Sequence, residues 1–113
     1  MRATRSLVFA VLAVAAVVAP RLGHTADPEV ALAIEKNRFQ PTEIRVKAGT
    51  PFVLVVTNKD ATPEEFESKE LRVEKIIPAN KTLKVRMPAL KAGAYRFFGE
   101  YHEATAKGRI VAE

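Results

Sequence analysis

Apolar and polar residues alternate one by one along much of this chain. In Val30–Glu35 the large apolar side chains occupy every second position, and Thr82–Met87 repeats the pattern. Successive side chains of a strand point to opposite faces, so this period of two predicts half-buried β-strands. Phe52–Thr57 is apolar on both faces, which predicts a strand at the centre of a sheet.

The pattern predicts seven strands in all and no long helix. The seven are Val30–Glu35, Glu43–Lys47, Phe52–Thr57, Leu71–Ile77, Thr82–Met87, Ala94–Phe98 and Arg109–Ala112. In the fourth of them Leu71, Val73 and Ile76 are the inward candidates, and the polar segment Ala61–Glu70 before it is expected to be a loop. Short strands separated by regularly spaced turns predict an all-β fold, a Greek-key β-sandwich of about seven strands.

The first 26 residues have the layout of a secretory signal. Arg2 and Arg5 precede an apolar run, Leu7–Ala19, and a short polar segment follows it. The run has about 13 residues, short of the roughly 20 that span a bilayer, which favours a cleaved signal over the alternative of a permanent anchor. We expect cleavage after Ala26, and therefore a signal peptide at residues 1–26, one domain at 27–113 and a periplasmic location.

The positive charge of the chain belongs largely to that signal segment. The whole sequence has 18 Lys and Arg against 13 Asp and Glu, a formal net charge of +5. Three of the basic residues precede residue 27, which leaves +2 for the domain. No basic stripe is interleaved with aromatic residues, so we expect no nucleic-acid partner.

The chain has no cysteine, which excludes disulfides and thiolate metal sites.

Several short motifs occur in an order that is specific to one superfamily. They are FxPxxIxVxAGxPF at Phe39–Phe52, NxD at Asn58–Asp60, GxYxF at Gly93–Phe97, His102, which is the one histidine of residues 27–113, and GxIV at Gly108–Val111. Together they resemble the cupredoxin superfamily. More narrowly, they resemble the EfeO-type cupredoxin-like domains, small periplasmic proteins associated with bacterial iron uptake. The resemblance covers nearly the whole predicted domain and implies a cupredoxin-like sandwich.

The resemblance also implies where copper ligands would stand, and most of them are missing. Glu64 follows a proline at the place of the first histidine, and Gly99 stands at the place of the thiolate. His102 matches the second histidine, whereas Thr105 and Ala106 stand near the place of the axial methionine. Blue copper depends on the copper–thiolate bond, so this chain is not expected to hold blue copper or to carry electrons through it.

The remaining carboxylates and imidazole suit a different ion. Such ligands favour Fe(II), Mn(II), Zn(II) or Cu(II), whereas Cu(I) prefers the missing sulfur ligands. The resemblance implies that the two loops meet at one end of the sandwich, and we expect Glu64 and His102 to be ligands there. The candidate metal residues are Glu64, Glu65, Glu67, Glu100, His102 and Glu103. Glu100 or Glu67 would complete the set, with Tyr101 or Thr105 orienting it.

Each of these residues also has a structural interpretation without a metal. An acidic loop is commonly just solvated, and Glu67 could simply lie on an outward face. His102 could be a hydrogen-bonded loop histidine, and Met87 fits the core better than a ligand set.

Three functions are compatible with these residues. The first is a metal-binding accessory protein of iron uptake, which holds a divalent ion, Fe or Cu, and works beside a membrane permease or another periplasmic iron-uptake partner. The second is assistance to Fe(II) oxidation by such a partner, or copper binding. The third is a metal-free protein-interaction module. No hydrolase motif is present, and we expect no enzymatic activity from the chain alone.

Overall fold

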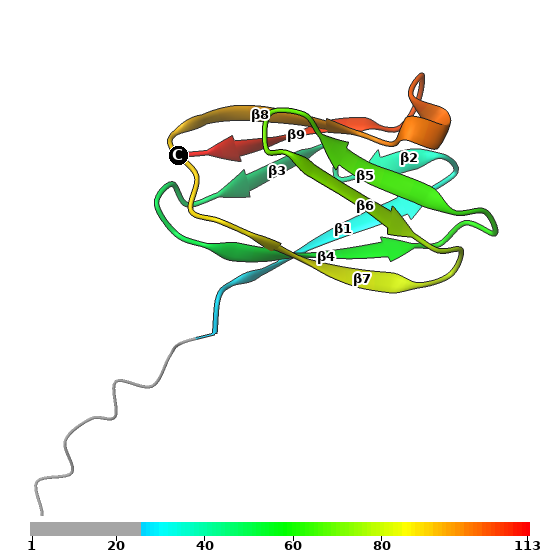
Figure 1. Cartoon of the computed structure of the whole chain (residues 1–113), viewed down its shortest axis with the longest axis horizontal. Helices are drawn as coiled ribbons and strands as arrows, with labels where there is room; N and C mark the ends of the chain where they lie inside the picture. Colours follow the sequence, from blue (N-terminus) through cyan, green and yellow to red (C-terminus); the bar gives the residue numbers. More distant parts are fainter. Residues whose placement is uncertain (1–25) are drawn as a thin grey trace, which may run out of the picture.

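The computed structural model describes residues 26–113, which form nine strands and one short 3-10 helix, η1 (Figure 1). The strands are β1 (Glu29–Glu35), β2 (Arg38–Gln40), β3 (Glu43–Val46), β4 (Phe52–Asn58), β5 (Glu64–Ser68), β6 (Val73–Ile77), β7 (Thr82–Met87), β8 (Gly93–Phe98) and β9 (Lys107–Ala112). The helix η1 (Glu100–His102) lies between β8 and β9. The all-β prediction is thus confirmed, with nine strands in place of about seven.

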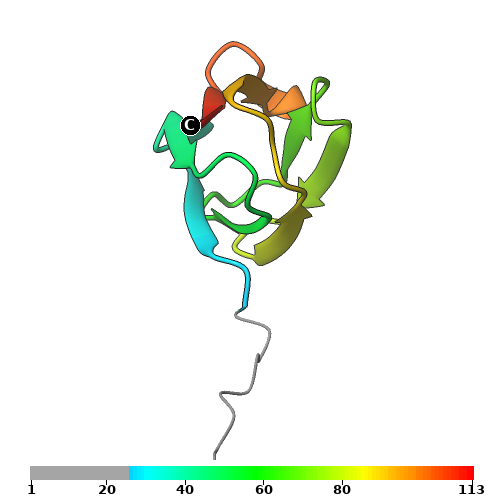
Figure 2. The same ribbon diagram turned by 90° about the vertical axis from the view of Figure 1, so that its left-hand side faces the viewer.

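The strands form the two layers of a sandwich (Figures 1 and 2). One sheet has four strands in the order β2-β1-β4-β7, and the other has five in the order β3-β9-β8-β5-β6. Both sheets are mixed, because β1 pairs parallel to β4 and β3 pairs parallel to β9, while the other pairs are antiparallel. Neighbours in sequence therefore often lie in different sheets.

The core lies between the two layers and follows the period-two pattern. In β4, which is central in its sheet as predicted, every second residue from Phe52 to Asn58 is buried. Met87 is 2% exposed, so it belongs to the core. Three rings join the layers: the centroid of Phe39 lies 5.0 Å from that of Phe97 and 6.1 Å from that of Phe66, both edge-on. Such aromatic contacts add to the burial of apolar area.

Two strands, β2 and β5, were not predicted from the sequence pattern. The short strand β2 pairs with β1 through a tight turn, and β5 runs through the segment Ala61–Glu70, for which a loop was wrong. The sequence of β5 is EEFES, whose one apolar residue, Phe66, is fully buried. The glutamates on either side of Phe66 hid its period of two.

The isoleucine that β6 turns toward the core also differs from the prediction. Ile76 is 55% exposed, whereas Ile77 is fully buried and Val73 is half-buried. The strand begins at Val73, after Arg72 has turned the chain with a positive φ of 54°. Alternation from Val73 puts Ile77 on the same inward face and turns Ile76 outward.

The predicted signal segment lies outside the described residues, except for Ala26, so its cleavage stays a prediction. Among residues 26–113 no helix is long and apolar enough to cross a bilayer.

Candidate metal centre

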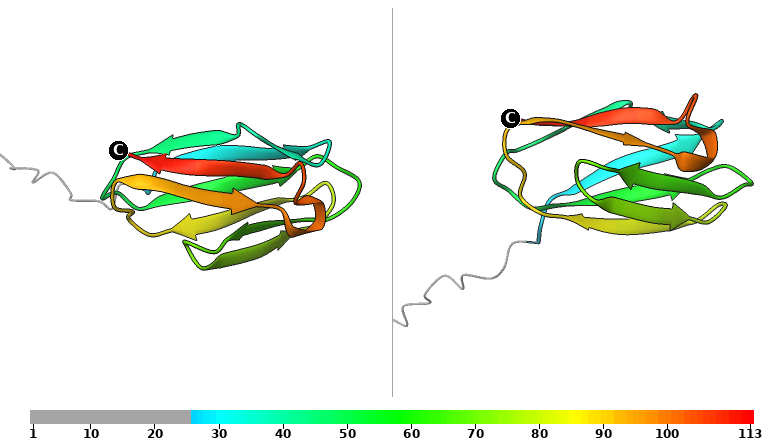
Figure 3. Two further views of the ribbon diagram at one scale, coloured as in Figure 1. Left: turned by 90° about the horizontal axis from the view of Figure 1, so that it is seen from above. Right: turned by 45° about the horizontal axis from the view of Figure 1, so that its top comes forward.

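Three connections meet at one end of the sandwich (Figure 3). They are the β1–β2 turn, the segment between β4 and β5, and the loop from β8 through η1 to β9. Backbone hydrogen bonds hold the last loop in shape: the amide of Gly99 donates to Ala106 O at 2.9 Å, and the amide of Ala106 donates to His102 O at 2.8 Å. The position of His102 is therefore set by the loop backbone on both sides of it.

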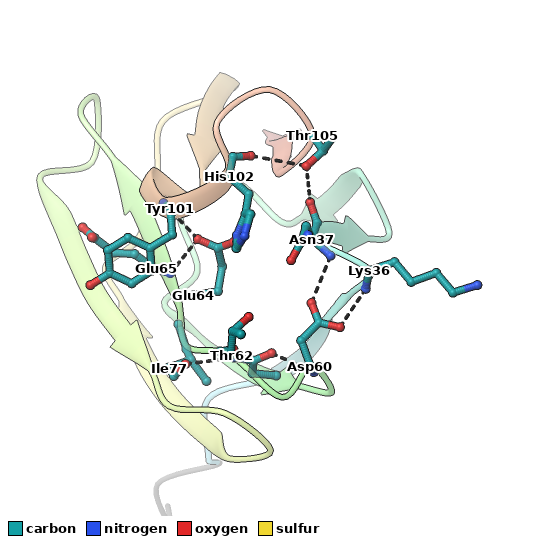
Figure 4. A network of polar contacts seen from close by, with 11 residues as sticks. Lys36, Asn37, Asp60, Thr62, Glu64, Glu65, Ile77, Tyr101, His102 and Thr105 are labelled. Carbon is teal, nitrogen blue, oxygen red and sulfur yellow. Dashed lines mark hydrogen bonds and ion pairs between the residues drawn. The ribbon is translucent and has the colours of Figure 1, made fainter.

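The motif residue Asp60 ties the first two connections together (Figure 4), and the motif residue Asn58 links the second of them to β6. The carboxylate of Asp60 accepts hydrogen bonds from the backbone amides of Lys36 at 2.8 Å and Asn37 at 3.0 Å, both of which have a positive φ. Asn58 is fully buried and donates through Nδ2 to the carbonyl of Ile77 at 3.0 Å. The two hydrogen bonds to Asp60 hold the β1–β2 turn in a conformation that non-glycine residues rarely adopt.

Thr105 joins the third connection to the same turn. Its hydroxyl donates to the carbonyl of Asn37 at 2.6 Å (Figure 4). Thr105 therefore braces the loop that carries His102.

His102 and Glu64 meet directly at this end of the fold. Nδ1 of His102 lies 2.5 Å from Oε2 of Glu64 (Figure 4). The other oxygen of Glu64 accepts hydrogen bonds from the amides of Glu65 at 3.0 Å and Tyr101 at 3.2 Å. Glu64 is 1% exposed, and a buried carboxylate needs such partners.

The distance between the two side chains decides what each of them can do. Two atoms that bind one ion at about 2.1 Å lie about 3 Å or more apart. At 2.5 Å, Nδ1 and Oε2 are within hydrogen-bonding distance of each other. With Nδ1 donating, the lone pair of Nε2 is free, and Nε2 has no hydrogen-bond partner among the described residues. The His102 side chain is 31% exposed, so solvent reaches it.

Gly99 makes room for the buried carboxylate. A Cβ at this position would lie 2.6 Å from Cδ and from Oε1 of Glu64, and 2.9 Å from Cβ of Ala106. Real Cβ atoms do not come that close to other heavy atoms, so any side chain at residue 99 would displace Glu64. The small residue at 99 and the glutamate at 64 therefore depend on each other.

The other predicted ligands gather elsewhere. Glu67 and Glu100 lie with Glu65 and Glu74 in a group that we call the carboxylate cluster, in which one ligand oxygen from each lies within 4.8 Å of the others. Glu103 lines a groove with Lys69 and Lys107 and is not a member of the cluster. The structure thus divides the predicted set into the Glu64–His102 pair, the carboxylate cluster and Glu103.

Burial and neighbouring carboxyl groups raise the pKa of two members of the cluster, Glu65 and Glu67. Burial, with added contributions from the carboxyl groups of Glu74 and Glu100, raises the pKa of Glu65 from 4.5 to about 8. Partial loss of hydration, followed by the negative charges of Glu74 and Glu100, also raises the pKa of Glu67 above its ordinary range. At neutral pH the cluster therefore needs a proton or another positive charge.

Glu74 is the cluster member that the sequence did not indicate. It lies directly opposite Glu67 in the β5–β6 pair. Recognising β5 as a strand, with a hairpin over Lys69–Arg72, would have placed these two glutamates side by side. The missing signal was therefore the strand, since Glu74 itself lay inside the predicted strand Leu71–Ile77.

Residues 7–112 match the model of the family described as Cupredoxin-like domain. This chain belongs to that family. A curated relative, the uncharacterized protein RP394 of Rickettsia prowazekii (strain Madrid E), is 37% identical over 83 residues, which are 74% of this chain and 66% of the relative. The chain thus spans slightly less than two thirds of that relative's length.

Several solved cupredoxin-like structures share the fold. Auracyanin A, a blue copper protein of Chloroflexus aurantiacus, has a TM-score of 0.65 at 17% identity, over 75% of this chain and 98% of its own. The metal-binding domain of the Cu(I)-exporting ATPase CopA of Streptococcus pneumoniae D39, solved with Cu(I), has a TM-score of 0.67 at 16% identity, over 75% and 84% of the two chains. Amicyanin of Paracoccus versutus has a TM-score of 0.59 at 21% identity, over 78% and 83%. At these identities the likeness shows the fold alone.

This cupredoxin-like domain does not fit blue copper. The chain has no cysteine to supply the thiolate, and the carboxylate of Glu64 fills the space beside Gly99. Among residues 26–113, His102 is the one histidine, and its side chain is 31% exposed.

Proposed function

We propose that this protein is a periplasmic metal-binding accessory protein of ferrous iron uptake, as the EfeO-type resemblance implies. The observation that carries the proposal is the His102–Glu64 pair. Metal-binding histidines commonly donate their second ring N–H to a carboxylate, which fixes the ring and makes the ligating nitrogen more basic. Glu64 is placed to do this at 2.5 Å from Nδ1, with Nε2 left for the ion.

Oxygen and nitrogen ligands support iron over Cu(I). The only methionine among residues 26–113 is the buried Met87, and the chain has no cysteine, so soft sulfur ligands are not offered at this end. An ion held by Nε2 would keep positions open for water or for ligands from another protein. Such a site suits an ion that is passed on, to a membrane permease or to a periplasmic iron-uptake partner.

An oxygen-free calorimetric titration with Fe(II) tests the proposal. The variants are His102→Ala and Glu64→Gln, each made in protein produced from the full chain. Glu29→Gln is the matched control, because it removes a carboxylate from the start of β1, at the opposite end of the sandwich. We expect a binding event that is lost in His102→Ala, weakened about 10- to 100-fold in Glu64→Gln and unchanged in Glu29→Gln.

The same titration separates the other functions. An Fe(II) isotherm that His102→Ala leaves unchanged would overturn the proposal. Binding of Cu(II) through His102 with no binding of Fe(II) would favour the copper alternative. Folded protein that binds neither ion would favour a protein-interaction module.

A further inference from the structure

The carboxylate cluster is built by three elements of the outer face at this end of the fold. Glu65 and Glu67 project from the same face of β5, and Glu74 lies opposite Glu67 on the edge strand β6. Glu100 comes from η1, which contacts β5. The alternation of β5 separates the cluster from the inward-facing Glu64, and Figure 4 shows the carboxylates of Glu64 and Glu65 pointing apart.

The arrangement is unfavourable without a counter-charge. Like charges placed directly opposite in an antiparallel pair destabilise a sheet, and Glu67 and Glu74 are such a pair. Five other glutamates of residues 26–113, at positions 29, 43, 64, 70 and 113, each contact a basic side chain. No member of the carboxylate cluster has an ion pair within that described part of the chain. Local conflicts of this kind are expected at functional sites.

An independent observation at Glu65 points to a missing partner. Glu65 is 2% exposed, its carboxylate supplies one of the cluster's four oxygens, and its Oε1 has no hydrogen-bond partner. A buried carboxylate oxygen without a partner is costly, because it has lost its water and gained nothing in return. A cation bound among the four oxygens would supply that partner.

We propose that Glu65, Glu67, Glu74 and Glu100 form a second metal site, distinct from His102, for a hard divalent cation of about the size of Ca²⁺ or Mn²⁺. The ligand set contains oxygen alone, which favours Ca²⁺, Mg²⁺ and Mn²⁺ over softer ions. This site does not depend on the proposed role of His102.

The spacing of the oxygens matches the larger of these ions. Oxygens bound to one Ca²⁺ at about 2.3–2.6 Å lie at most about 5 Å apart, whereas Mg²⁺ at about 2.1 Å permits only about 4.2 Å. The four oxygens all lie within 4.8 Å of one another, which is inside the span that Ca²⁺ allows and wider than the limit for Mg²⁺. Glu74 and Glu100 are exposed, which lets their side chains close around a slightly smaller ion such as Mn²⁺.

Calorimetric titration with Mn(II), and separately with Ca(II), tests the second site. The decisive variant is Glu74→Gln, because Glu74 is exposed and its replacement leaves the core intact. Glu65→Gln removes the buried carboxyl group and keeps nearly the same shape. We expect one Mn(II) site whose affinity falls at least about tenfold in both variants and is unchanged in His102→Ala and in the control Glu29→Gln.

The outcomes for the two sites are separable. Folded wild-type protein that binds neither Mn(II) nor Ca(II), or Mn(II) binding that Glu74→Gln leaves intact, would overturn the second site. Loss of Mn(II) binding in His102→Ala would overturn its independence. If Fe(II) binding ignores His102 while Mn(II) binding still requires Glu74, the proposed function fails and the carboxylate site survives.

Discussion

Glu64 and Glu65 are adjacent in the chain and both buried, yet their carboxylates meet different surroundings. Glu64 has a partner for each oxygen: two backbone amides on one and the ring of His102 on the other. Glu65 has an oxygen with no partner and three other carboxylates nearby. We infer that Glu64 positions a ligand, while Glu65 is itself placed to bind a cation.

The mutual dependence of Gly99 and Glu64 gives a prediction at the scale of single residues. Gly99→Ala should lower the free energy of unfolding by about 1–3 kcal/mol, because the new methyl group overlaps the Glu64 carboxylate. Glu64→Ala should cost about 3 kcal/mol through its lost hydrogen bonds. The double variant should cost less than the sum, because the methyl group then enters vacated space. Urea unfolding of all four proteins measures this coupling.

The control for that cycle pairs Gly99→Ala with Glu29→Ala, because Glu29 starts β1 at the other end of the sandwich from Gly99. These two effects should add within about 0.5 kcal/mol. Equally additive effects for Gly99 and Glu64 would show that the two residues do not compete for space.

At the scale of elements, the candidate site depends on three connections that are separated in sequence. The β1–β2 turn is held by Asp60, which precedes β5, and by Thr105, which precedes β9. His102 is thus supported by hydrogen bonds that cross between the two sheets. Removing a hydrogen bond that braces one connection should therefore increase the opening of the loop that carries the histidine.

Thr105→Val tests this bracing, since valine keeps the shape of threonine and removes the hydroxyl. Loss of the hydrogen bond to Asn37 O should lower the free energy of unfolding by about 1 kcal/mol. The amides of Gly99–Ala106 should then exchange faster with deuterium, because the loop opens more often. The matched control is Thr82→Val, which removes an exposed hydroxyl pair with Thr57. Similar loop exchange in both variants would contradict the bracing role.

At the scale of the whole molecule, the sandwich carries a destabilising charge arrangement on its surface. Unfolded Glu65 releases its proton near pH 4.5, whereas burial and the neighbouring carboxyl groups raise the pKa of folded Glu65 to about 8. Between these values the folded state binds more protons than the unfolded state. The free energy of unfolding should therefore fall as the pH rises through this window.

Glu65→Gln isolates that effect in protein freed of metal by a chelator. Urea unfolding at several pH values from 5 to 8 should show the variant gaining stability relative to wild type as the pH rises, by at most about 1.4 kcal/mol per pH unit. Glu29→Gln is the control, because it removes a carboxylate that is not a member of the carboxylate cluster. Parallel curves for wild type and Glu65→Gln would contradict the raised pKa.

The sequence by itself determined the fold class and most of the strands. Alternating apolar residues can bury one face only as strands, so all seven predicted strands agree with the structure within two residues at each end, although β6 turns Ile77 rather than Ile76 inward. The absence of cysteine excluded blue copper without any coordinates. The lone histidine of the domain was likewise singled out before its surroundings were known.

Only the tertiary structure decided what the acidic residues do. The sequence did not indicate β5 as a strand, because its inward position 64 is a glutamate rather than an apolar residue. The buried Glu64 is stabilised by hydrogen bonds to other elements. Whether two carboxylates face each other depends on the strands, because their register placed Glu74 opposite Glu67 and the alternation along β5 parted Glu65 from Glu64. Charge, hydration and distance set the chemistry of a carboxylate, and all three depend on residues that are distant in the chain.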